Sequence, residues 1–314
     1  MKPRHLVSIA DLEPTEILRL FRDAKVIKEK QKTNKVYQPL KNKFLGLIFT
    51  EPSTRTRVSF EVGMTQLGGK TIFLSGKEIQ LGRRESIRDT ALVLSRYLDG
   101  IVVRTRAHQE IVELAKYATI PVVNGLSSLL HPCQVLSDIF TIMEKKSLVI
   151  GEQSSVIGMK IAFIGDGNNV ANSWALGAAK LGLNITYATP VGYEPDRKIL
   201  KQALTIARNT RSKIVLTTNP REAVKDADVI YTDVWVSMGQ EKEKEKRLKA
   251  FKSYQVNKKL LARGKPDVMV MHCLPAHRGE EITDEVIDSK NSVVFDQAEN
   301  RLHLQKAVLC YLMK

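Results

Sequence analysis

The stretch FLGLIFTEPSTRTRVSFEVG, residues 44–63, joins a short apolar run to a polar turn and a helical pattern. The run at 44–49 has the length and the apolar content of a buried strand. Pro52 suits the turn that precedes a helix. Apolar residues then recur at helical spacing from Phe60 to Leu67, before a Gly-Gly stop. The stretch therefore predicts a strand that leads directly into a helix.

This alternation of strand and helix extends along almost the whole chain. Short apolar runs predict strands at 44–49, 71–74, 100–104, 120–124, 160–165, 184–189, 213–217, 228–232, 267–272 and 292–295. Amphipathic stretches predict helices at 14–31, 85–97, 107–117, about 133–144, 169–181, 197–209 and about 298–313. Such alternation is typical of parallel sheets covered by helices on both faces. We therefore expect an α/β fold with two doubly wound parallel-sheet domains that face a cleft.

The boundary between the two domains is predicted where the alternation lapses into glycine, serine and polar residues, at 144–160. A chain of 314 residues also suits two domains better than one. We expect residues 1–146 to form the first domain and residues 147–297 to form the second. The final helix, 298–314, is expected to pack back onto the first domain.

The composition is that of an ordinary soluble globular protein. The formal net charge of +15 suits a nucleic-acid partner, but acidic residues are scattered among the basic ones and no nucleic-acid-binding motif is present. An anionic small substrate accounts for the charge at least as well. Three widely spaced cysteines without a CxxC pair favour reduced thiols, and no run suits a membrane span or a signal peptide. We expect a cytoplasmic protein without nucleic-acid or membrane partners.

The polar turn after the first predicted strand is a candidate anion site. Residues Ser53 to Thr56 fall at a helix start, where backbone N–H groups lack helical partners and bind phosphate well. Arg55 and Arg57 can add charge-assisted hydrogen bonds. A capped helix with solvated arginines is the alternative, and the pattern is not a P-loop. Five consecutive polar side chains after a parallel-type strand favour the anion site.

The chain carries a series of motifs that occur in the same order in a known family. They are STRTR (53–57), QLGRRESIRDTALVLSRYLDGIVVR (80–104), HPCQ (131–134), FIGDGNNVANS (163–173), DVWVSMG (233–239), HCLP (272–275) and AENR (298–301). Together they resemble the aspartate/ornithine carbamoyltransferase family. The FIGDGNNVANS and DVWVSMG segments resemble its ornithine-specific members more narrowly. The resemblance runs nearly end to end.

The resemblance implies that the first substrate is carbamoyl phosphate, a compact dianion with a reactive carbonyl group. The residues expected to bind it are Ser53, Thr54, Arg55, Thr56, Arg57, Gln80, Arg104, His131, Gln134, Cys273, Leu274 and Arg301. Of these, Thr56, Arg104 and His131 would donate hydrogen bonds to the carbonyl oxygen as it becomes an oxyanion. Judged alone, Arg104 could equally form a structural ion pair, and His131 could be a helix-start histidine with no chemical role.

The second domain is implied to bind ornithine. The residues expected to do so are Asn169, Asp233, Ser237 and Met238. The δ-amine must be neutral to attack the carbonyl carbon, whereas a free alkyl ammonium has a pKa of about 10.4. Asp233 and Cys273 are therefore candidates to receive or orient its proton. The catalytic set implied by the resemblance is Arg55, Thr56, Arg104, His131, Asp233 and Cys273, and the products are citrulline and phosphate.

Two loops carry further expectations. Gln80 lies in a loop that, in this family, reaches the active site of a neighbouring subunit. The resemblance thus implies a homotrimer, or a multiple of trimers, with active sites shared between subunits. The Lys/Glu-rich segment within 240–255 is ordinarily a solvated helix face. Its position beside the expected ornithine segment suggests a loop that closes on the second substrate.

The main competing interpretation keeps the chemistry and changes the acceptor to aspartate, putrescine or acetylornithine. Aspartate-specific members typically carry a proline where Cys273 stands and lack the SMG element. Putrescine or acetylornithine would require changes around Asn169 and Asp233 that the sequence does not show. Ornithine is therefore favoured.

Two segments bear on whether the protein binds a nucleotide cofactor or a metal ion. The GDGNNVA segment, 165–171, follows a predicted strand, but it lacks the strict GxGxxG pattern and no acidic residue ends the next strand. These features make an NAD-binding protein a weaker interpretation. His272, Cys273 and His277 are too loosely spaced for a recognisable metal motif. We expect neither a cofactor nor a metal.

Overall fold

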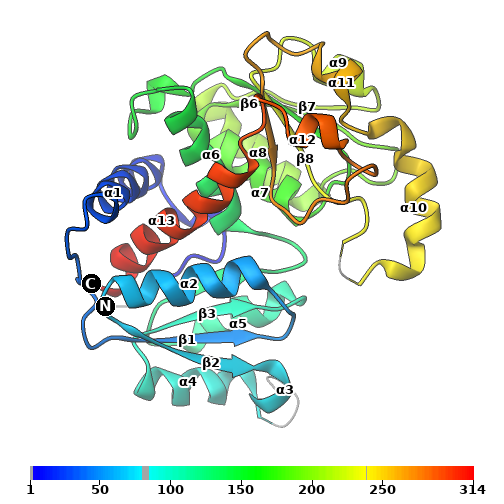
Figure 1. The fold of residues 1–314 in the computed structure, drawn as a ribbon. Coiled ribbons are helices and arrows are strands. Elements are labelled where there is room, and N and C mark those ends of the chain that lie inside the picture. Colours follow the sequence, from blue (N-terminus) through cyan, green and yellow to red (C-terminus); the bar gives the residue numbers. More distant parts are fainter. Residues whose placement is uncertain (1–2, 80–84, 238) are drawn as a thin grey trace. The chain divides into compact units, whose positions relative to one another are not determined.

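The chain folds into two compact units, one of which also includes the C-terminal segment (Figure 1). Unit 1 comprises Met1–Gly151 and Glu299–Lys314, and unit 2 comprises Glu152–Ala298. This computed structural model describes residues 3–79, 85–237 and 239–314. Each unit is built on a sheet whose strands all run parallel. The predicted α/β class with two doubly wound parallel sheets is confirmed.

Unit 1 has a four-stranded sheet in the order β2-β1-β3-β4. Its strands are β1 (Phe44–Phe49), β2 (Lys70–Ser75), β3 (Gly100–Arg104) and β4 (Val122–Leu126). Its helices are η1 (Ile9–Asp11), α1 (Pro14–Lys32), α2 (Thr54–Gln66), α3 (Gly76–Ile79), α4 (Ile87–Tyr97), α5 (His108–Tyr117), α6 (Pro132–Lys145) and most of α13 (Val294–Met313). Because crossovers between parallel strands are right-handed, α2 and α4 cover opposite faces of this sheet, as Figure 1 shows.

Unit 2 has a five-stranded sheet in the order β7-β6-β5-β8-β9. Its strands are β5 (Lys160–Ile164), β6 (Asn184–Ala188), β7 (Ile214–Thr217), β8 (Val229–Thr232) and β9 (Met269–His272). Its helices are η2 (Gln153–Ser155), α7 (Asn169–Leu181), α8 (Arg197–Thr210), α9 (Pro220–Ala223), η3 (Glu241–Glu243), α10 (Lys244–Phe251), η4 (Lys252–Tyr254), α11 (Lys258–Leu261) and α12 (Asp284–Ile287).

Each sheet contains a point at which the order of its strands reverses. In unit 1 the chain runs from β1 outward to β2 and then returns past β1 to β3. In unit 2 it runs from β5 through β6 to β7 and then returns past β5 to β8. Ligands of open parallel sheets bind beyond the carboxyl ends of the strands at such reversals. The fold therefore predicts one ligand site beyond β1 and β3, and another beyond β5 and β8.

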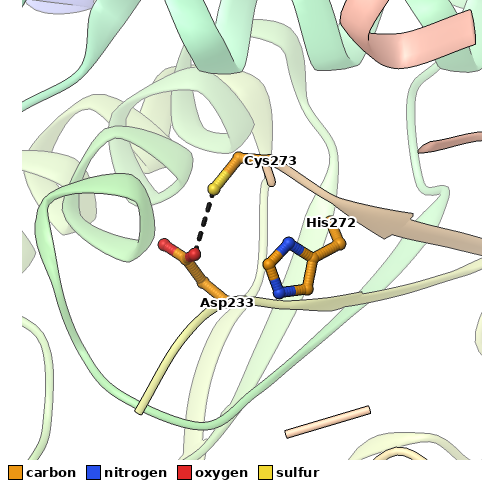
Figure 2. Close-up of side chains that lie close together, drawn as sticks. All are labelled: Asp233, His272 and Cys273. Atoms are coloured by element: carbon orange, nitrogen blue, oxygen red, sulfur yellow. Dashed lines mark hydrogen bonds between the residues drawn. The ribbon is translucent and has the colours of Figure 1, made fainter. Parts of the chain in front are cut away.

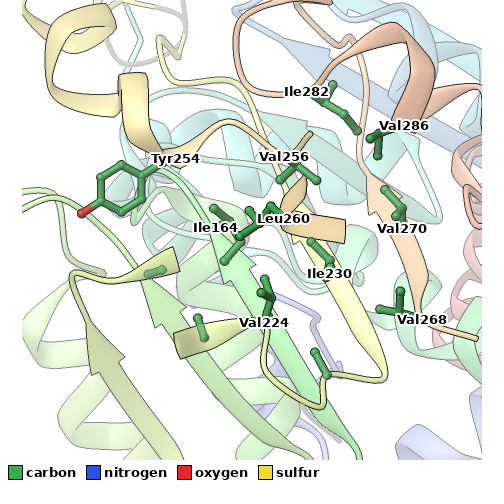
Figure 3. Close-up of a cluster of buried hydrophobic side chains, with 14 of the residues drawn as sticks. Ile164, Val224, Ile230, Tyr254, Val256, Leu260, Val268, Val270, Ile282 and Val286 are labelled. Carbon is green, nitrogen blue, oxygen red and sulfur yellow. The ribbon is translucent and has the colours of Figure 1, made fainter. Parts of the chain in front are cut away.

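A buried apolar cluster supports the second of these positions. Ile164 on β5, Ile230 on β8 and Val270 on β9 are fully buried, and they pack with apolar side chains from the short helices α9, α11 and α12 (Figure 3). These helices are only four residues long, too short to show a helical period in sequence, and we did not predict them. Burial of this apolar surface fixes the strands whose ends carry the site.

One predicted strand is wrong. Residues 292–295 form no strand: Ser292 makes only an isolated bridge to Val270, and α13 already begins at Val294. Short apolar runs do not distinguish a strand from the start of a buried helix.

Of the helices in the described part of the chain, none combines the length and the apolar character that a bilayer span requires. Cys133, Cys273 and Cys310 are free thiols.

Candidate active site

The turn between β1 and α2 has the helix-start geometry that the sequence predicts. Ser53 is the N-cap of α2, and its Oγ accepts a hydrogen bond from the Thr56 N–H at 3.3 Å. Thr54 is the first helical residue, and Arg55 is half-buried. The helix start therefore presents backbone N–H groups and a guanidinium at the predicted anion site.

Arg104 and His131 come from separate elements of unit 1. Arg104 is the last residue of β3, in register with Phe49 at the end of β1. His131 is the N-cap residue of α6. Both side chains are buried. Arg104 thus lies at the strand reversal, where the fold predicts a ligand.

The protonation state of His131 follows from its surroundings. Burial, and then the positive charges of Arg301, Arg104 and Arg55, hold the pKa of His131 well below its ordinary value. The imidazole is therefore neutral near pH 7 and keeps an N–H donor without adding to the positive charge. Three guanidinium groups and a neutral imidazole form a site suited to an anion with a polarisable carbonyl group.

Arg301, on α13, joins this site from the far end of the chain. Its Nη2 donates to Thr56 Oγ1 at 3.2 Å, and its Nη1 donates to Gln134 Oε1. Gln134 in turn donates to Asp138 Oδ1 at 2.8 Å. The structure thus brings together three predicted residues that lie on α2, α6 and α13.

Arg57 lies differently from the other predicted phosphate ligands. Its Nε donates to Glu61 Oε1 at 2.9 Å, and its guanidinium lies 3.6 Å from the centre of the Phe73 ring. These contacts give Arg57 a structural partner on α2 and another on β2. Gln80, the other predicted ligand nearby in sequence, lies outside the described residues.

In unit 2 two predicted site residues follow neighbouring strands of the sheet. Asp233 follows β8, and Cys273 follows β9. The Cys273 thiol donates to Asp233 Oδ1 at 3.0 Å, and Figure 2 shows the two side chains pointing toward each other. Oδ1 also accepts the Val234 N–H at 2.8 Å. Asp233 therefore presents a carboxylate that is already oriented by the protein.

Asn168 and Asn169 occupy different positions in the turn between β5 and α7. Asn169 is the first residue of α7, whereas Asn168 is its N-cap. Asn168 Oδ1 accepts from the Val170 N–H at 2.9 Å, and its Nδ2 donates to Asp233 Oδ2 at 2.7 Å. Asn168 was not among the predicted site residues. Asparagine is a preferred N-cap residue, and Asn168 directly precedes a predicted helix. This position could have indicated its role.

The glycine-rich turn after β5 also lies close to another chain segment. A Cβ on Gly167 would lie 2.2 Å from the backbone of Glu194 and Pro195. Glycine is therefore needed here for the approach of two chain segments, without any appeal to a dinucleotide.

His272 orients the turn that carries Cys273 and Leu274. Its Nδ1 accepts the Leu274 N–H at 2.8 Å, so Nε2 carries the proton and donates to Glu281 Oε1 at 3.0 Å. Both His272 and Glu281 are fully buried. From the sequence, His272 was considered only as a metal ligand, and Glu281 was not predicted. The contact between the two side chains depends on how residues 272–281 fold.

Two groups of side chains in the described ranges could in principle hold a metal ion. Asp233, His272 and Cys273 offer atoms within 4.8 Å of one another, as do His277, Glu280 and Glu281. In the first group both ring nitrogens of His272 already have protein partners. Coordination through His272 would break one of these hydrogen bonds, and we assign no metal to this site.

The side chains of Gln240 and Arg247 hold the segment around Ser237 in place. The Ser237 N–H donates to Gln240 Oε1 at 3.0 Å. Arg247, on α10, donates to the Trp235 carbonyl at 2.9 Å and pairs with Asp166 at 3.1 Å. Residues 240–255 are largely helical, in η3, α10 and η4. Met238 lies outside the described residues.

The thiols of Cys133 and Cys310 are buried. Burial raises the pKa of Cys133 to about 12 and that of Cys310 to about 11. Thiols with such values remain protonated at neutral pH and are poor nucleophiles.

The fold and these residues define a protein with two parallel-sheet units, each with a candidate ligand site beyond the carboxyl ends of its strands. The carbamoyl-P binding domain of aspartate/ornithine carbamoyltransferases matches residues 4–144, and their Asp/Orn binding domain matches residues 157–312. The chain belongs to the aspartate/ornithine carbamoyltransferase family. The resemblance inferred from the motifs is confirmed.

Curated relatives of this chain are named more specifically, as ornithine carbamoyltransferases. The chain is 53% identical over 313 residues to the ornithine carbamoyltransferase of Pyrococcus abyssi, covering 100% of this chain and 96% of the relative. It is 54% identical over 310 residues to the anabolic ornithine carbamoyltransferase of Pyrococcus furiosus, covering 99% of this chain and 96% of the relative.

Solved structures show the same likeness. The ornithine carbamoyltransferase from Pyrococcus furiosus superposes with a TM-score of 0.94 at 54% identity, covering 99% of this chain and 97% of the other. The anabolic enzyme from Campylobacter jejuni superposes with a TM-score of 0.91 at 41% identity, covering 99% of each chain.

Proposed function

We propose that this protein is an ornithine carbamoyltransferase, which transfers the carbamoyl group of carbamoyl phosphate to the δ-amine of L-ornithine. The observation that carries the proposal is the pair of sites at the strand reversals. One is cationic around a neutral histidine, and the other presents a carboxylate, amides and a thiol. The names of the full-length relatives favour ornithine as the acceptor.

Carbamoyl phosphate is assigned to unit 1, with residues 1–146 and the C-terminal helix as its domain. The helix start at Ser53 and the guanidiniums of Arg55 and Arg301 bind the phosphate dianion. Thr56, Arg104 and His131 donate to the carbonyl oxygen. Because His131 is neutral, it polarises the carbonyl by donating a hydrogen bond.

Ornithine is assigned to residues 147–297. The carboxylate of Asp233 pairs with the α-ammonium group, and Asn169, Ser237 and the backbone at Met238 complete the contacts to the amino-acid end. Cys273 and Leu274 lie at the start of the turn after β9, where a reacting δ-amine would be held. Asn168 orients Asp233 by binding the carboxylate oxygen that Cys273 does not contact.

The reaction follows from these assignments. The neutral δ-nitrogen attacks the carbonyl carbon, and the resulting oxyanion is stabilised by the hydrogen-bond donors named above. The bond from carbon to the phosphate oxygen then breaks, and the nitrogen loses a proton to the Asp233–Cys273 pair. Citrulline and phosphate are the products. Phosphate is a good leaving group, so no covalent intermediate with the enzyme is required.

The assembly proposal is a homotrimer, or a multiple of trimers, in the cytoplasm. Gln80 would complete the carbamoyl phosphate site of a neighbouring subunit. Mixing inactive Arg55→Ala and Gln80→Ala proteins tests this directly, because hybrid trimers would contain intact sites and regain activity. Failure of the mixture to regain any activity would reject sharing.

Carbon-13-labelled carbamoyl phosphate tests the proposed reaction. Purified protein with L-ornithine should form one citrulline, labelled at the ureido carbon, for each phosphate released. Phosphate release without labelled citrulline would indicate hydrolysis and contradict the proposal. Arginine synthesis and citrulline breakdown use the same site, and the name of the Pyrococcus furiosus relative favours the synthetic direction.

A further inference from the structure

Gln305 lies on α13 one helical turn beyond Arg301 and is fully buried. Residues four positions apart lie on the same face of a helix. Gln305 Oε1 accepts from Arg301 Nε at 3.2 Å and from Ser59 Oγ at 2.9 Å. Ser59 belongs to α2, the helix whose start forms the anion site. A single amide oxygen thus ties the Arg301 guanidinium to α2.

We propose that Gln305 is a positioning residue, which orients the guanidinium of Arg301 toward the phosphate of carbamoyl phosphate without neutralising its charge. The inference rests on the function proposed above for this site. Nothing in the family motifs singles out Gln305, since AENR ends at Arg301.

The neutrality of the acceptors is the central observation. Arg301 donates from Nε to Gln305 Oε1, and from its two terminal nitrogens to Gln134 Oε1 and Thr56 Oγ1. An amide or hydroxyl oxygen fixes the plane of a guanidinium and leaves its positive charge for an anion. A carboxylate in the same place would form a bidentate ion pair and compete with that anion.

Arginines elsewhere in the chain show the contrasting arrangement. Arg57 pairs with Glu61, and the buried Arg247 pairs with Asp166. Those guanidiniums hold structural elements together through carboxylates. The guanidinium of Arg301 donates to three neutral oxygens at a site proposed to bind a dianion.

The direction of the Gln305 amide is fixed by these contacts. Oε1 faces two donors, the Nε–H of Arg301 and the hydroxyl of Ser59. A reversed amide would place its NH₂ group against the Nε–H of Arg301, with a donor facing a donor. Arg301 and Gln305 therefore constrain each other.

The test compares two substitutions of Gln305 with a charge-matched control. Gln305→Met keeps a similar volume and removes the acceptor, whereas Gln305→Glu adds a carboxylate beside Arg301. Gln66→Glu adds the same charge at another α13 contact, because Gln66 accepts a hydrogen bond from Lys306 at 2.8 Å. Affinity for inorganic phosphate is measured by titration calorimetry, and steady-state kinetics give both KM values.

Loss of one hydrogen bond to a charged group predicts roughly tenfold weaker phosphate binding in Gln305→Met, and a larger loss in Gln305→Glu. The KM for carbamoyl phosphate should rise in parallel, while the KM for ornithine stays within about twofold. Gln66→Glu should bind phosphate like the wild type. Ser59→Ala, which removes the second contact of Gln305, should weaken phosphate binding by a smaller factor.

Unchanged phosphate affinity in both Gln305 variants would overturn the proposal. An equal loss in Gln66→Glu would also overturn it, because the effect would then reflect net charge alone. If Gln305→Glu does not fold, Gln305→Met and Ser59→Ala decide the question. Failure of the wild type to make citrulline would reject the proposed function, whereas the phosphate affinities would still decide the role of Gln305.

Discussion

The thiol of Cys273 lies 3.0 Å from Asp233 Oδ1, although 40 positions separate the two residues in sequence. They meet because β8 and β9 are neighbours whose last residues, Thr232 and His272, are in register. Each reactive side chain is the first residue beyond its strand. A thiol and a carboxylate in contact can share the proton that the δ-ammonium of ornithine must lose.

Replacement of Cys273 by serine should therefore affect ornithine more than carbamoyl phosphate. A hydroxyl is a far weaker acid than a thiol and changes the proton shared with Asp233. We expect the KM for ornithine to rise roughly tenfold, a loss typical of one hydrogen bond to a charged group, and the pH profile to shift. Steady-state kinetics across pH measure both effects.

Cys310→Ser is the matched control for this substitution. Cys310 lies on α13, and burial raises its pKa to about 11. Its replacement should leave both KM values and the pH profile unchanged. Equal kinetics for Cys273→Ser and the wild type would reject the role assigned to Cys273.

Arg55→Ala should abolish useful turnover and leave the fold intact. Loss of one preorganised donor to developing charge typically costs about 10²–10³ in kcat. Arg57→Ala should cost less than about tenfold, because the Arg57 guanidinium is already engaged by Glu61 and Phe73. Citrulline formation and the circular dichroism of each variant measure activity and folding separately. Near-normal turnover in Arg55→Ala would contradict the assignment of Arg55 to the phosphate site.

Arg247→Met should destabilise unit 2 and weaken ornithine binding. It leaves Asp166 buried without its cationic partner, which typically costs about 3–5 kcal/mol. Adding Asp166→Asn should recover much of that stability but not the ornithine affinity, because the Trp235 carbonyl still lacks its donor. Urea denaturation and ornithine titration measure the two effects. Strict additivity of the two substitutions in stability would contradict the pairing.

The lowered pKa of Lys306 should make the stability of the protein depend on pH. Burial lowers the pKa of Lys306 from the ordinary 10.5 to about 8. Between these values the unfolded chain holds a proton on Lys306 that the folded protein does not. The unfolded state then binds more protons, so the free energy of unfolding contributed by Lys306 rises with pH across this window. Below about pH 8 this contribution is constant.

Lys306→Met removes the titrating group and should flatten that rise. Urea denaturation of both proteins between pH 7 and 10.5 gives the difference in unfolding free energy at each pH. The wild type should gain stability relative to the variant as the pH increases. A difference that stays constant with pH would show that Lys306 titrates alike in both states.

The sequence was sufficient to predict the class of fold and the local structure at the start of the candidate anion site. The run from Phe44 to Phe49 is a strand, and Ser53 caps the helix that follows it. Such features depend on residues close in sequence, whose periodicity and capping chemistry are visible without a structure. The motifs added the family, which the comparisons confirm.

The order of the strands could not be read from the sequence. Strand reversals between β1 and β3, and between β5 and β8, arise from the packing of crossovers over the whole sheet. Asn168 and Gln305 were missed because they contact residues that are distant in sequence, and Glu281 was missed because its contact with His272 crosses an irregular loop. The wrong strand at 292–295 reflects a short apolar run that is compatible with either structure.

The measurement that tests the central claim most directly compares carbamoyl acceptors. Purified protein and carbamoyl phosphate are incubated in parallel with ornithine, aspartate, putrescine and acetylornithine, and each carbamoylated product is quantified as kcat/KM. We predict that ornithine exceeds every other acceptor by at least about 10²-fold, as expected where a site pairs buried polar groups with its substrate. Turnover with aspartate alone, or with none of the four, would contradict the proposed function.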